Sequence, residues 1–282
     1  MASQWERLLK NTGRWVGSFT RLSPQGELLS DIPTVVELKP LDHGNLMYQT
    51  VTKQPPGKPP EEMVLQYRTL ARNLLFLENG AFSQGAMQWG PFSGFGAELG
   101  LMVDNHRLRL VQLFDNHREF QQLTLIREHR EGTAPSTRSK LMVDDLVGTW
   151  EGEAVTVYPD LQPDDTYATH LEITHQNGTV EQTLQFGETA PPIKSQGVVS
   201  GDRILFTSGS QSVQVLLLPD GASSTCPVQI EPRQPLFLEV GWLISPHHRQ
   251  RLIRQYSAQG TWVSLTLVDE TKVDTQRVSQ PD

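Results

Sequence analysis

An internal duplication of the chain constrains its fold more than any other feature of the sequence. Residues 74–83 align without gaps with residues 215–224, an offset of 141 positions from Leu74 to Val215. Residues 109–128 align without gaps with residues 251–270, an offset of 142. Because the offset is almost constant over separated blocks, the sequence predicts one structural unit that is formed twice.

The openings of the two copies and the segment between them indicate where the units begin and end. Gly13-Arg14-Trp15 recurs as Gly148-Thr149-Trp150 at an offset of 135, so a few residues are inserted inside the second copy. Residues 129–140 are polar and small and have the composition of a linker. We therefore predict a first domain over residues 1–130, a linker over 131–140 and a second domain over 141–282.

Each copy has the composition of an antiparallel β-meander. Short runs rich in Val, Leu, Thr and Phe are separated by turn signals roughly every 8 to 12 residues. Asn79-Gly80 and Asp220-Gly221 can supply the positive φ angles of tight hairpins. About eight to ten such strands favour a barrel, because closure removes the free edges. We predict an all-β fold of two tandem lipocalin-like or calycin-like antiparallel β-barrels, each preceded by a short helix.

Charge, hydropathy and cysteine content narrow the classes of partner. The net charge of -8 argues against nucleic acid, which needs a clustered basic surface. No stretch approaches the roughly 18 apolar residues of a membrane-spanning helix, and the N-terminus lacks the pattern of a secretory signal. Cys226 is the single cysteine, which favours a reducing compartment. We expect a cytoplasmic protein with no transmembrane segment and no nucleic-acid partner.

The motifs that carry catalysis are weak throughout the sequence. Residues 94–100 resemble a dinucleotide-binding loop only loosely and lack a βαβ context. His170 and His175 are five apart on a predicted strand and would face opposite sides, so they cannot chelate one metal. Cys226 is expected to be buried and inert. The sequence therefore favours a non-enzymatic protein with no catalytic residue and no metal site.

Two pairs of residues recur and invite a structural interpretation. Trp15 with Arg109, and Trp150 with Arg251, join the first strand of each copy to its penultimate strand. We predict that each guanidinium stacks on the Trp face and closes one barrel end. The alternative is an inward Arg that anchors a ligand carboxylate. Recurrence favours the structural role, because a duplicated fold must keep its closure twice.

Aromatic residues beside flexible glycines indicate a second candidate site. Such side chains can line a pocket for a flat apolar ligand, and ordinary core packing explains them equally well. With the two arginines, the predicted ligand-binding set is Phe82, Trp89, Phe92, Phe95, Arg109, Trp242 and Arg251.

Three parts of the sequence resemble known families. The Gly-x-Trp openings look like those of the calycin superfamily. Residues 79–85 and 220–227, with the strands that begin at Arg251 and Ser264, resemble a family of lipocalin-like proteins with two tandem barrels, found in cyanobacteria and in chloroplast-bearing organisms. More distantly, Gly13-Arg14-Trp15 is similar to the opening of S-type phycobiliprotein lyases. The resemblance implies two calycin-like barrels and a cyanobacterial cytosol, or its stromal equivalent, as the compartment.

Three functions stay open at this stage. The first is a non-enzymatic binding protein for a small apolar or amphipathic ligand such as a bilin or other tetrapyrrole, a carotenoid or a lipid. The second is a bilin lyase or chaperone that hands a chromophore to a phycobiliprotein, with a photosynthetic protein as partner. The third is a ligand-free protein-interaction or assembly factor. Strand count does not separate them, because barrels of about eight strands can be filled or hollow.

Overall fold

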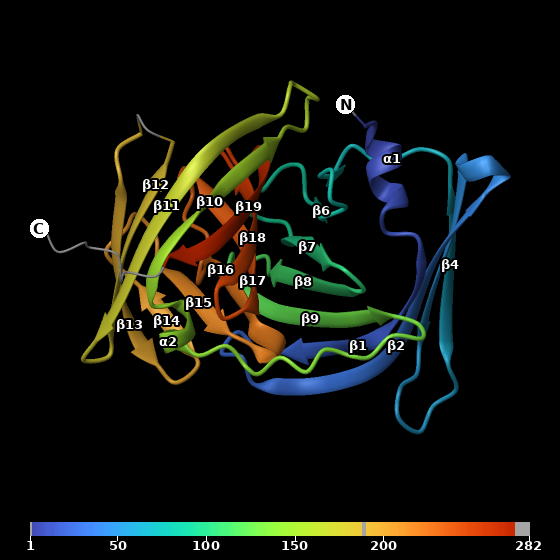
Figure 1. Cartoon of the computed structure of the whole chain (residues 1–282), viewed down its shortest axis with the longest axis horizontal. Coiled ribbons are helices and arrows are strands. Elements are labelled where there is room, and N and C mark those ends of the chain that lie inside the picture. The colour runs from blue at the N-terminus through green and yellow to red at the C-terminus, as the bar shows by residue number, and fades with distance from the viewer. Residues whose placement is uncertain (1, 188–189, 274–282) are drawn as a thin grey trace, which may run out of the picture.

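The computed structural model describes residues 2–187 and 190–273, and its dominant element is the antiparallel β-strand (Figure 1). The first copy consists of α1 (Gln4–Leu9), β1 (Gly13–Leu22), β2 (Leu28–Leu41), the 3-10 turn η1 (Asp42–Gly44), β3 (Leu46–Lys53), β4 (Glu61–Tyr67), β5 (Leu74–Phe76), β6 (Phe82–Gly85), β7 (Phe95–Val103), β8 (His106–Phe114) and β9 (Phe120–Arg130). The predicted all-β class, with a short helix before each copy, is confirmed.

The second copy repeats this order with one additional strand. It consists of α2 (Val143–Leu146), β10 (Gly148–Val157), β11 (Asp165–Gln176), β12 (Thr179–Phe186), β13 (Ile193–Ser200), β14 (Arg203–Phe206), β15 (Val213–Leu217), the 3-10 turn η2 (Pro219–Gly221), β16 (Ala222–Pro227), β17 (Leu236–Ser245), β18 (His248–Tyr256) and β19 (Trp262–Val273). Residues 131–140 between the copies contain no helix or strand; the domain boundaries stay a prediction. No helix in the described ranges is long and apolar enough to cross a membrane.

The two sheets differ in closure. Strands β10 to β19 form a closed barrel, whereas β1 to β9 form a nine-stranded sheet with β4 at one edge and β5 at the other. In the barrel, β14 pairs with both β13 and β15 and completes the circuit. In the first copy, residues 68–73 connect β4 to β5 and contain no strand. The first copy is therefore a half-barrel, open where the second copy has β14.

Helix α1 covers the open side of the half-barrel. A capping box between Ser3 and Glu6 fixes its start. The side-chain amide of Gln4 donates to the Phe76 carbonyl at 3.0 Å and accepts from the Phe76 N–H at 2.7 Å. These are the two hydrogen bonds that a neighbouring strand would offer to β5. The helix thereby protects a strand edge that would otherwise be exposed.

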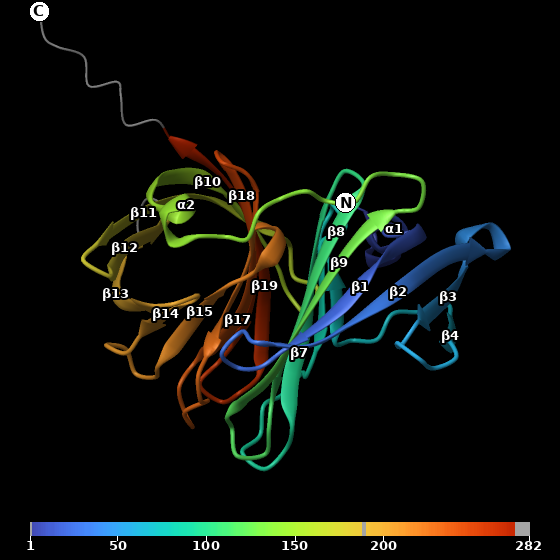
Figure 2. The same ribbon diagram turned by 90° about the horizontal axis from the view of Figure 1, so that it is seen from below.

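The two copies pack back to back through the outer faces of their sheets (Figure 2). The largest hydrophobic cluster of the described residues lies at this junction. It includes Leu108 and Leu110 of β8, and Leu238 and Val240 of β17. Smaller hydrophobic clusters lie in the interiors, around Trp15 in the half-barrel and around Trp150 in the barrel. The main core of the molecule therefore lies between the copies.

The contacts between the copies are reciprocal. Gln112 and Arg254 occupy equivalent positions of the repeat, as do Ser83 and Ser224, at the offsets of 142 and 141. Gln112 Nε2 donates to Ser224 Oγ at 2.8 Å, and Arg254 Nη1 donates to Ser83 Oγ at 3.2 Å. Each copy thus donates a hydrogen bond to the equivalent serine of the other copy, which is the pattern of an isologous interface.

The backbone repeats this reciprocity. The Phe120 N–H donates to the Val228 carbonyl at 3.0 Å, and the Trp262 N–H donates to the Met87 carbonyl at 2.9 Å. Phe120 is equivalent to Trp262 and Met87 to Val228 at the same two offsets. The two copies are therefore related across their junction as the subunits of a twofold dimer would be.

Candidate binding sites

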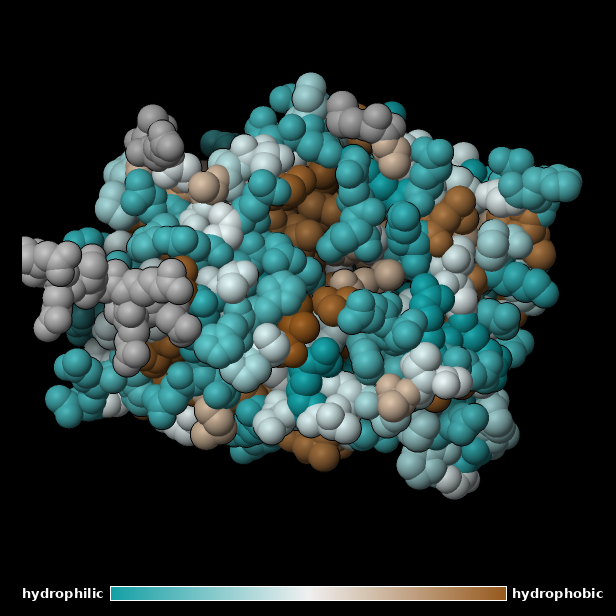
Figure 3. Space-filling model, viewed as in Figure 1, coloured by the Kyte–Doolittle hydropathy of each residue, from teal (hydrophilic) through white to brown (hydrophobic). Residues whose placement is uncertain are grey.

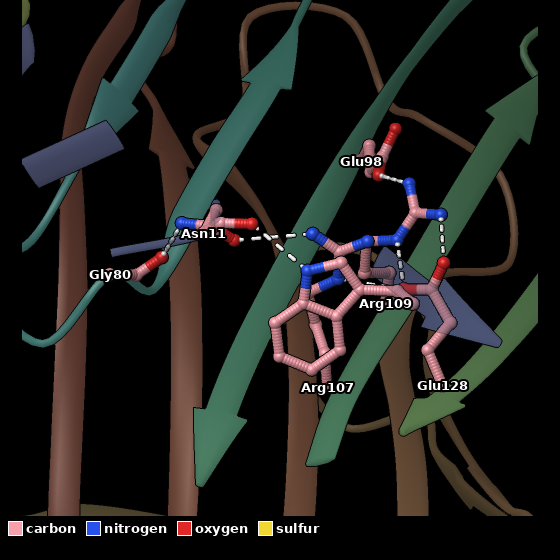
Figure 4. A network of polar contacts seen from close by, with 7 residues as sticks. Asn11, Gly80, Glu98, Arg107, Arg109 and Glu128 are labelled. Atoms are coloured by element: carbon pink, nitrogen blue, oxygen red, sulfur yellow. Dashed lines mark hydrogen bonds and ion pairs between the residues drawn. The ribbon is translucent and has the colours of Figure 1, made fainter. Parts of the chain in front are cut away.

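A cluster of ion pairs lies inside the half-barrel (Figure 4). Arg107 and Arg109 project from β8 toward Glu128 on the neighbouring strand β9. Arg107 Nε lies 2.7 Å and Arg109 Nη2 2.9 Å from the Glu128 carboxylate, and Arg109 Nη1 lies 2.6 Å from Glu98 Oε1. Burial acts to raise the pKa of Glu128, but the two guanidinium groups outweigh it and lower that pKa to about 2.

The closed barrel contains the same cluster at equivalent positions. Arg251 Nε lies 3.1 Å from Glu270 and Arg251 Nη1 lies 3.4 Å from Glu239. Arg249 also pairs with Glu270. Burial acts to raise the pKa of Glu270, and the two arginines again lower it below its usual value. Because both copies keep the cluster, its first role is to hold neighbouring strands of each sheet together.

The Trp residues of the Gly-x-Trp openings lie against these clusters. Trp15 and Trp150 are fully buried, and each Nε1 donates to a backbone carbonyl at 2.9 Å. The guanidinium over Trp15 at 4.5 Å is that of Arg107, and the one over Trp150 at 4.8 Å is that of Arg249. A second cation, Arg130 or Lys272, lies at a similar distance from each ring.

The stacking partners thus differ by two residues from those that the sequence suggested. Arg109 and Arg251 make ion pairs, and Arg109 lies over the ring of Phe19 instead, at 5.5 Å. Strand register is the reason. Trp15 pairs with Arg130 of β9, and along that strand Arg107 stands opposite Glu128 whereas Arg109 stands opposite Ile126, farther from Trp15.

The second glycine of each opening also has a structural reason. Gly17 pairs with Glu128, and Gly152 pairs with Glu270. A Cβ atom at Gly17 would lie 1.9 Å from the Arg127 carbonyl oxygen, and one at Gly152 would lie 2.2 Å from that of Asp269. Glycine therefore permits the close strand approach that places each glutamate beside its arginines.

Two members of the predicted ligand-binding set come together. Phe82 and Arg109 line a cavity of about 280 Å³ inside the half-barrel, between the helix α1 and strands β2, β5 and β8. Its walls are partly apolar and partly polar, and the charged groups among its lining residues are Glu98, Arg107 and Arg109. Sequence reasoning missed Glu98, Glu128 and Arg107, although the recurring Arg-x-Arg and the shared Glu128 and Glu270 were a usable signal.

The other members of the set are dispersed. Trp89, Phe95 and Trp242 are buried in the hydrophobic core between the copies. Phe92 is 91% exposed. Arg251 lies in the ion cluster of the closed barrel. The set therefore does not form one pocket.

A second concave region lies between the copies. It measures about 820 Å³ and is lined by residues 70–75, by residues 158–162 of the connection between β10 and β11, and by residues 261–263. Leu161, 70% exposed with a φ of 61°, stands at its rim together with Met87 and Val263. Figure 3 shows apolar surface between the two halves in this region. We refer to it as the junction hollow.

Among the residues that the structure describes, the remaining reactive groups lie apart from one another. No group of three or more His, Cys, Asp or Glu residues within 2–187 and 190–273 is placed to hold a metal ion. Cys226 is buried at the junction, and burial raises the pKa of its thiol. His175 and His248 each pair with one carboxylate near the surface.

Two family models match the chain, one for each copy. Residues 1–133 match the N-terminal part of a domain of unknown function, DUF3598. Residues 137–273 match the C-terminal domain of biogenesis factor required for ATP synthase 1. No curated protein matches the sequence.

Two solved structures illustrate the range of structural similarity. A protein of unknown function from the DUF3598 family of Nostoc punctiforme is 47% identical, covers 97% of this chain and 100% of its own, and superimposes with a TM-score of 0.91. The S-type phycobiliprotein lyase CpeS from Guillardia theta is 12% identical, covers 48% of this chain and 92% of its own, and has a TM-score of 0.40.

Proposed function

The chain belongs to the DUF3598 family, and we propose that it is a non-enzymatic assembly factor that binds a protein subunit of ATP synthase. The observation that carries the proposal is the similarity of residues 137–273 to the C-terminal domain of a biogenesis factor required for ATP synthase 1. An assembly factor holds its client by surface contacts and needs no reacting group. A cytoplasmic location, expected from the single cysteine, is part of this proposal.

The junction hollow is the surface that we propose for the client. Leu161, Met87 and Val263 are apolar and partly or largely exposed around it. Exposed apolar side chains that gather at a concave surface are typical of protein-binding sites. Leu161 also adopts a left-handed backbone conformation that a bulky residue rarely takes. Such strain is found where the structure presents a side chain for binding.

Binding to purified ATP synthase subunits tests this proposal. Each subunit is titrated against the immobilised full-length chain, and the Kd is measured by biolayer interferometry. We expect one subunit to bind, and the Leu161→Asp variant to bind it at least tenfold more weakly, because a carboxylate would have to be desolvated in the contact.

Val198→Asp is the matched control. Val198 is 60% exposed on β13 of the closed barrel, outside the junction hollow. This variant should bind like the unmodified chain. Equal binding by both variants would move the client away from the hollow, and failure of every subunit to bind would overturn the proposed function.

A second candidate function is favoured by the cavity of the half-barrel. We propose that this cavity binds a small apolar or amphipathic molecule, with Phe82 on its wall and Arg109 on its floor. At about 280 Å³ it lies just below the range of ligand pockets, about 300–1,000 Å³. A bilin, another tetrapyrrole or a carotenoid would need the cavity to widen, as would a lyase that hands a bilin to a phycobiliprotein. A smaller lipid-like ligand needs no such change.

Native mass spectrometry of the chain purified from its host tests the second candidate. A retained mass above 31.7 kDa that is released by denaturation supports it. The Leu65→Trp variant should lose that mass, because Leu65 lines the cavity and a larger side chain fills it. Release of the same mass from both proteins would place the ligand elsewhere.

A further inference from the structure

Arg107, on the floor of the half-barrel cavity, has bonding capacity that the described residues do not use. Its side chain is only 3% exposed. Nε donates to Glu128 at 2.7 Å and Nη1 donates to Asn11 Oδ1 at 3.4 Å. Nη2 is buried and has no hydrogen-bond partner among the described residues. A buried donor without a partner is costly, and most such groups in folded proteins are satisfied.

We infer that the half-barrel cavity binds a small amphipathic anion whose negative group lies against Arg107. This inference rests on the second candidate function, the binding of a small molecule in the same cavity. It adds the charge of the ligand, its size and the residue that selects it.

The charges around the cavity favour an anion. The charged residues that line the cavity are the cations Arg107 and Arg109 and the carboxylate Glu98; Glu128, which pairs with both arginines, is fully buried and does not line it. The surface of the cavity therefore presents two cations and one carboxylate to a ligand. Burial lowers the pKa of Arg107 below its usual value even though Glu128 acts to raise it, so the charge is incompletely compensated.

The walls and the volume define the rest of the ligand. Val36, Leu38, Leu74, Phe76 and Phe82 contribute apolar surface. A volume of about 280 Å³ holds roughly ten non-hydrogen atoms, taking about 30 Å³ for each as for a water molecule in the liquid. A monocarboxylate with a short alkyl chain or a single aromatic ring meets both conditions, because a carboxylate accepts guanidinium hydrogen bonds well.

The closed barrel supplies an internal control. Arg249 is the equivalent of Arg107, at the offset of 142. Its Nη2, like that of Arg107, is buried without a hydrogen-bond partner among the described residues, but it lies in an ion pair with Glu270. Arg249 also does not line the half-barrel cavity. Substitution of Arg249 therefore perturbs an equivalent ion cluster without touching the proposed site.

Titration calorimetry of the full-length chain with octanoate, and with 1-octanol as the uncharged probe of the same chain length, tests the inference. We expect octanoate to bind with one-to-one stoichiometry and at least tenfold more tightly than octanol. Arg107→Met should weaken octanoate binding at least tenfold, and Arg249→Met should change the affinity for octanoate less than twofold. Leu65→Trp should abolish binding of both probes without altering the ion cluster, and thermal unfolding checks that each variant is folded.

The outcomes separate the two claims. Equal affinity for octanoate and octanol would overturn the anion inference and leave a cavity for apolar ligands. Equal loss in Arg107→Met and Arg249→Met would also overturn it, because the effect would then follow the ion clusters and not the cavity. Failure of both probes to bind, together with no retained mass from the host, would overturn the small-ligand function itself.

Discussion

The half-barrel and the closed barrel share one sequence pattern but not one closure. Both keep the buried Trp, the two arginines and the glutamate at equivalent positions. The second copy is closed by β14, and the first is open between β4 and β5 and covered there by α1. The ion cluster is therefore not the device that closes a barrel. It joins β8 to β9 and β18 to β19 whether or not the circuit is complete.

The interiors of the two copies differ as well. The interior of the closed barrel around Trp150 contains a packed hydrophobic cluster. The open side of the half-barrel leaves a cavity above the equivalent ion cluster. A duplicated unit can thus keep one copy as a packed support while the other offers an interior site, and this contrast can be tested by substitution.

The largest effect is expected from removing the shared glutamates. Glu270→Ala leaves Arg249 and Arg251 buried without their main partner, and removing one partner of a buried ion pair costs about 3–5 kcal/mol. Glu128→Ala should cost less, because Arg109 lines a cavity that water can enter, and its remaining pair with Glu98, at 2.6 Å, is shorter than that of Arg251 with Glu239, at 3.4 Å. Urea unfolding measures both free energies; a larger loss for Glu128→Ala would contradict the comparison.

Protonation of Glu128 at acid pH should destabilise the fold. The folded-state pKa of Glu128, about 2, lies below its ordinary value of 4.5, so this group stabilises the fold above about pH 4.5. That stability, about 3 kcal/mol at most, is lost as pH falls from about 4.5 to 2. Urea unfolding at a series of pH values measures it. Glu128→Gln should show a shallower loss over this interval, and an unchanged slope would refute the assignment.

The two copies make equivalent contacts across their junction, but Arg254 should contribute more to stability than its equivalent, Gln112. Arg254 is fully buried, lies over Trp262 at 3.4 Å and bonds to Ser83 and Ala86 of the other copy. Arg254→Ala should cost about 3 kcal/mol, since hydrogen bonds to charged groups and a stacked cation are lost together.

Gln112 is the equivalent of Arg254 in the first copy. Gln112→Ala removes uncharged hydrogen bonds and should cost about 1–2 kcal/mol. Calorimetric Tm values for both variants decide the order. A cost for Gln112→Ala equal to that for Arg254→Ala would show that position in the repeat, and not charge, sets the contribution.

The smallest effect is expected at the edge of the half-barrel. Gln4→Ala removes the two hydrogen bonds to Phe76 and should cost about 1 kcal/mol. The amide of Phe76 should then exchange with solvent faster, while amides of β15 in the closed barrel keep their rates. Hydrogen exchange read by mass spectrometry measures both segments. Unchanged exchange at β5 would mean that α1 does not protect this edge.

The sequence predicted the class of fold well because that information is local and repeated. Alternating apolar runs, turn residues and the recurring Gly-x-Trp openings define the strands of each copy without reference to distant segments. The partner of each Trp was predicted two residues away from its true position. Arg107 and Arg109 face the same side of β8, so only the register with β9 selects between them.

The aromatic set from Phe82 to Phe95 shows where local patterns fail. Alternation on β8 places Arg107 and Arg109 inside and Leu108 and Leu110 outside, the reverse of a solvated barrel. The outer face is apolar because the other copy covers it. A strand pattern records which residues share a face but not what lies against that face.

By itself, the sequence determined that one β unit is built twice, because strand, turn and glycine preferences act over a few residues. Only the tertiary structure decided that one copy closes and the other stays open. Twelve residues, 201–212, separate β13 from β15 and leave room for β14, whereas six residues, 68–73, separate β4 from β5. Closure also depends on pairing between segments far apart in the chain, and on a core formed between two outer faces, neither of which a local pattern specifies.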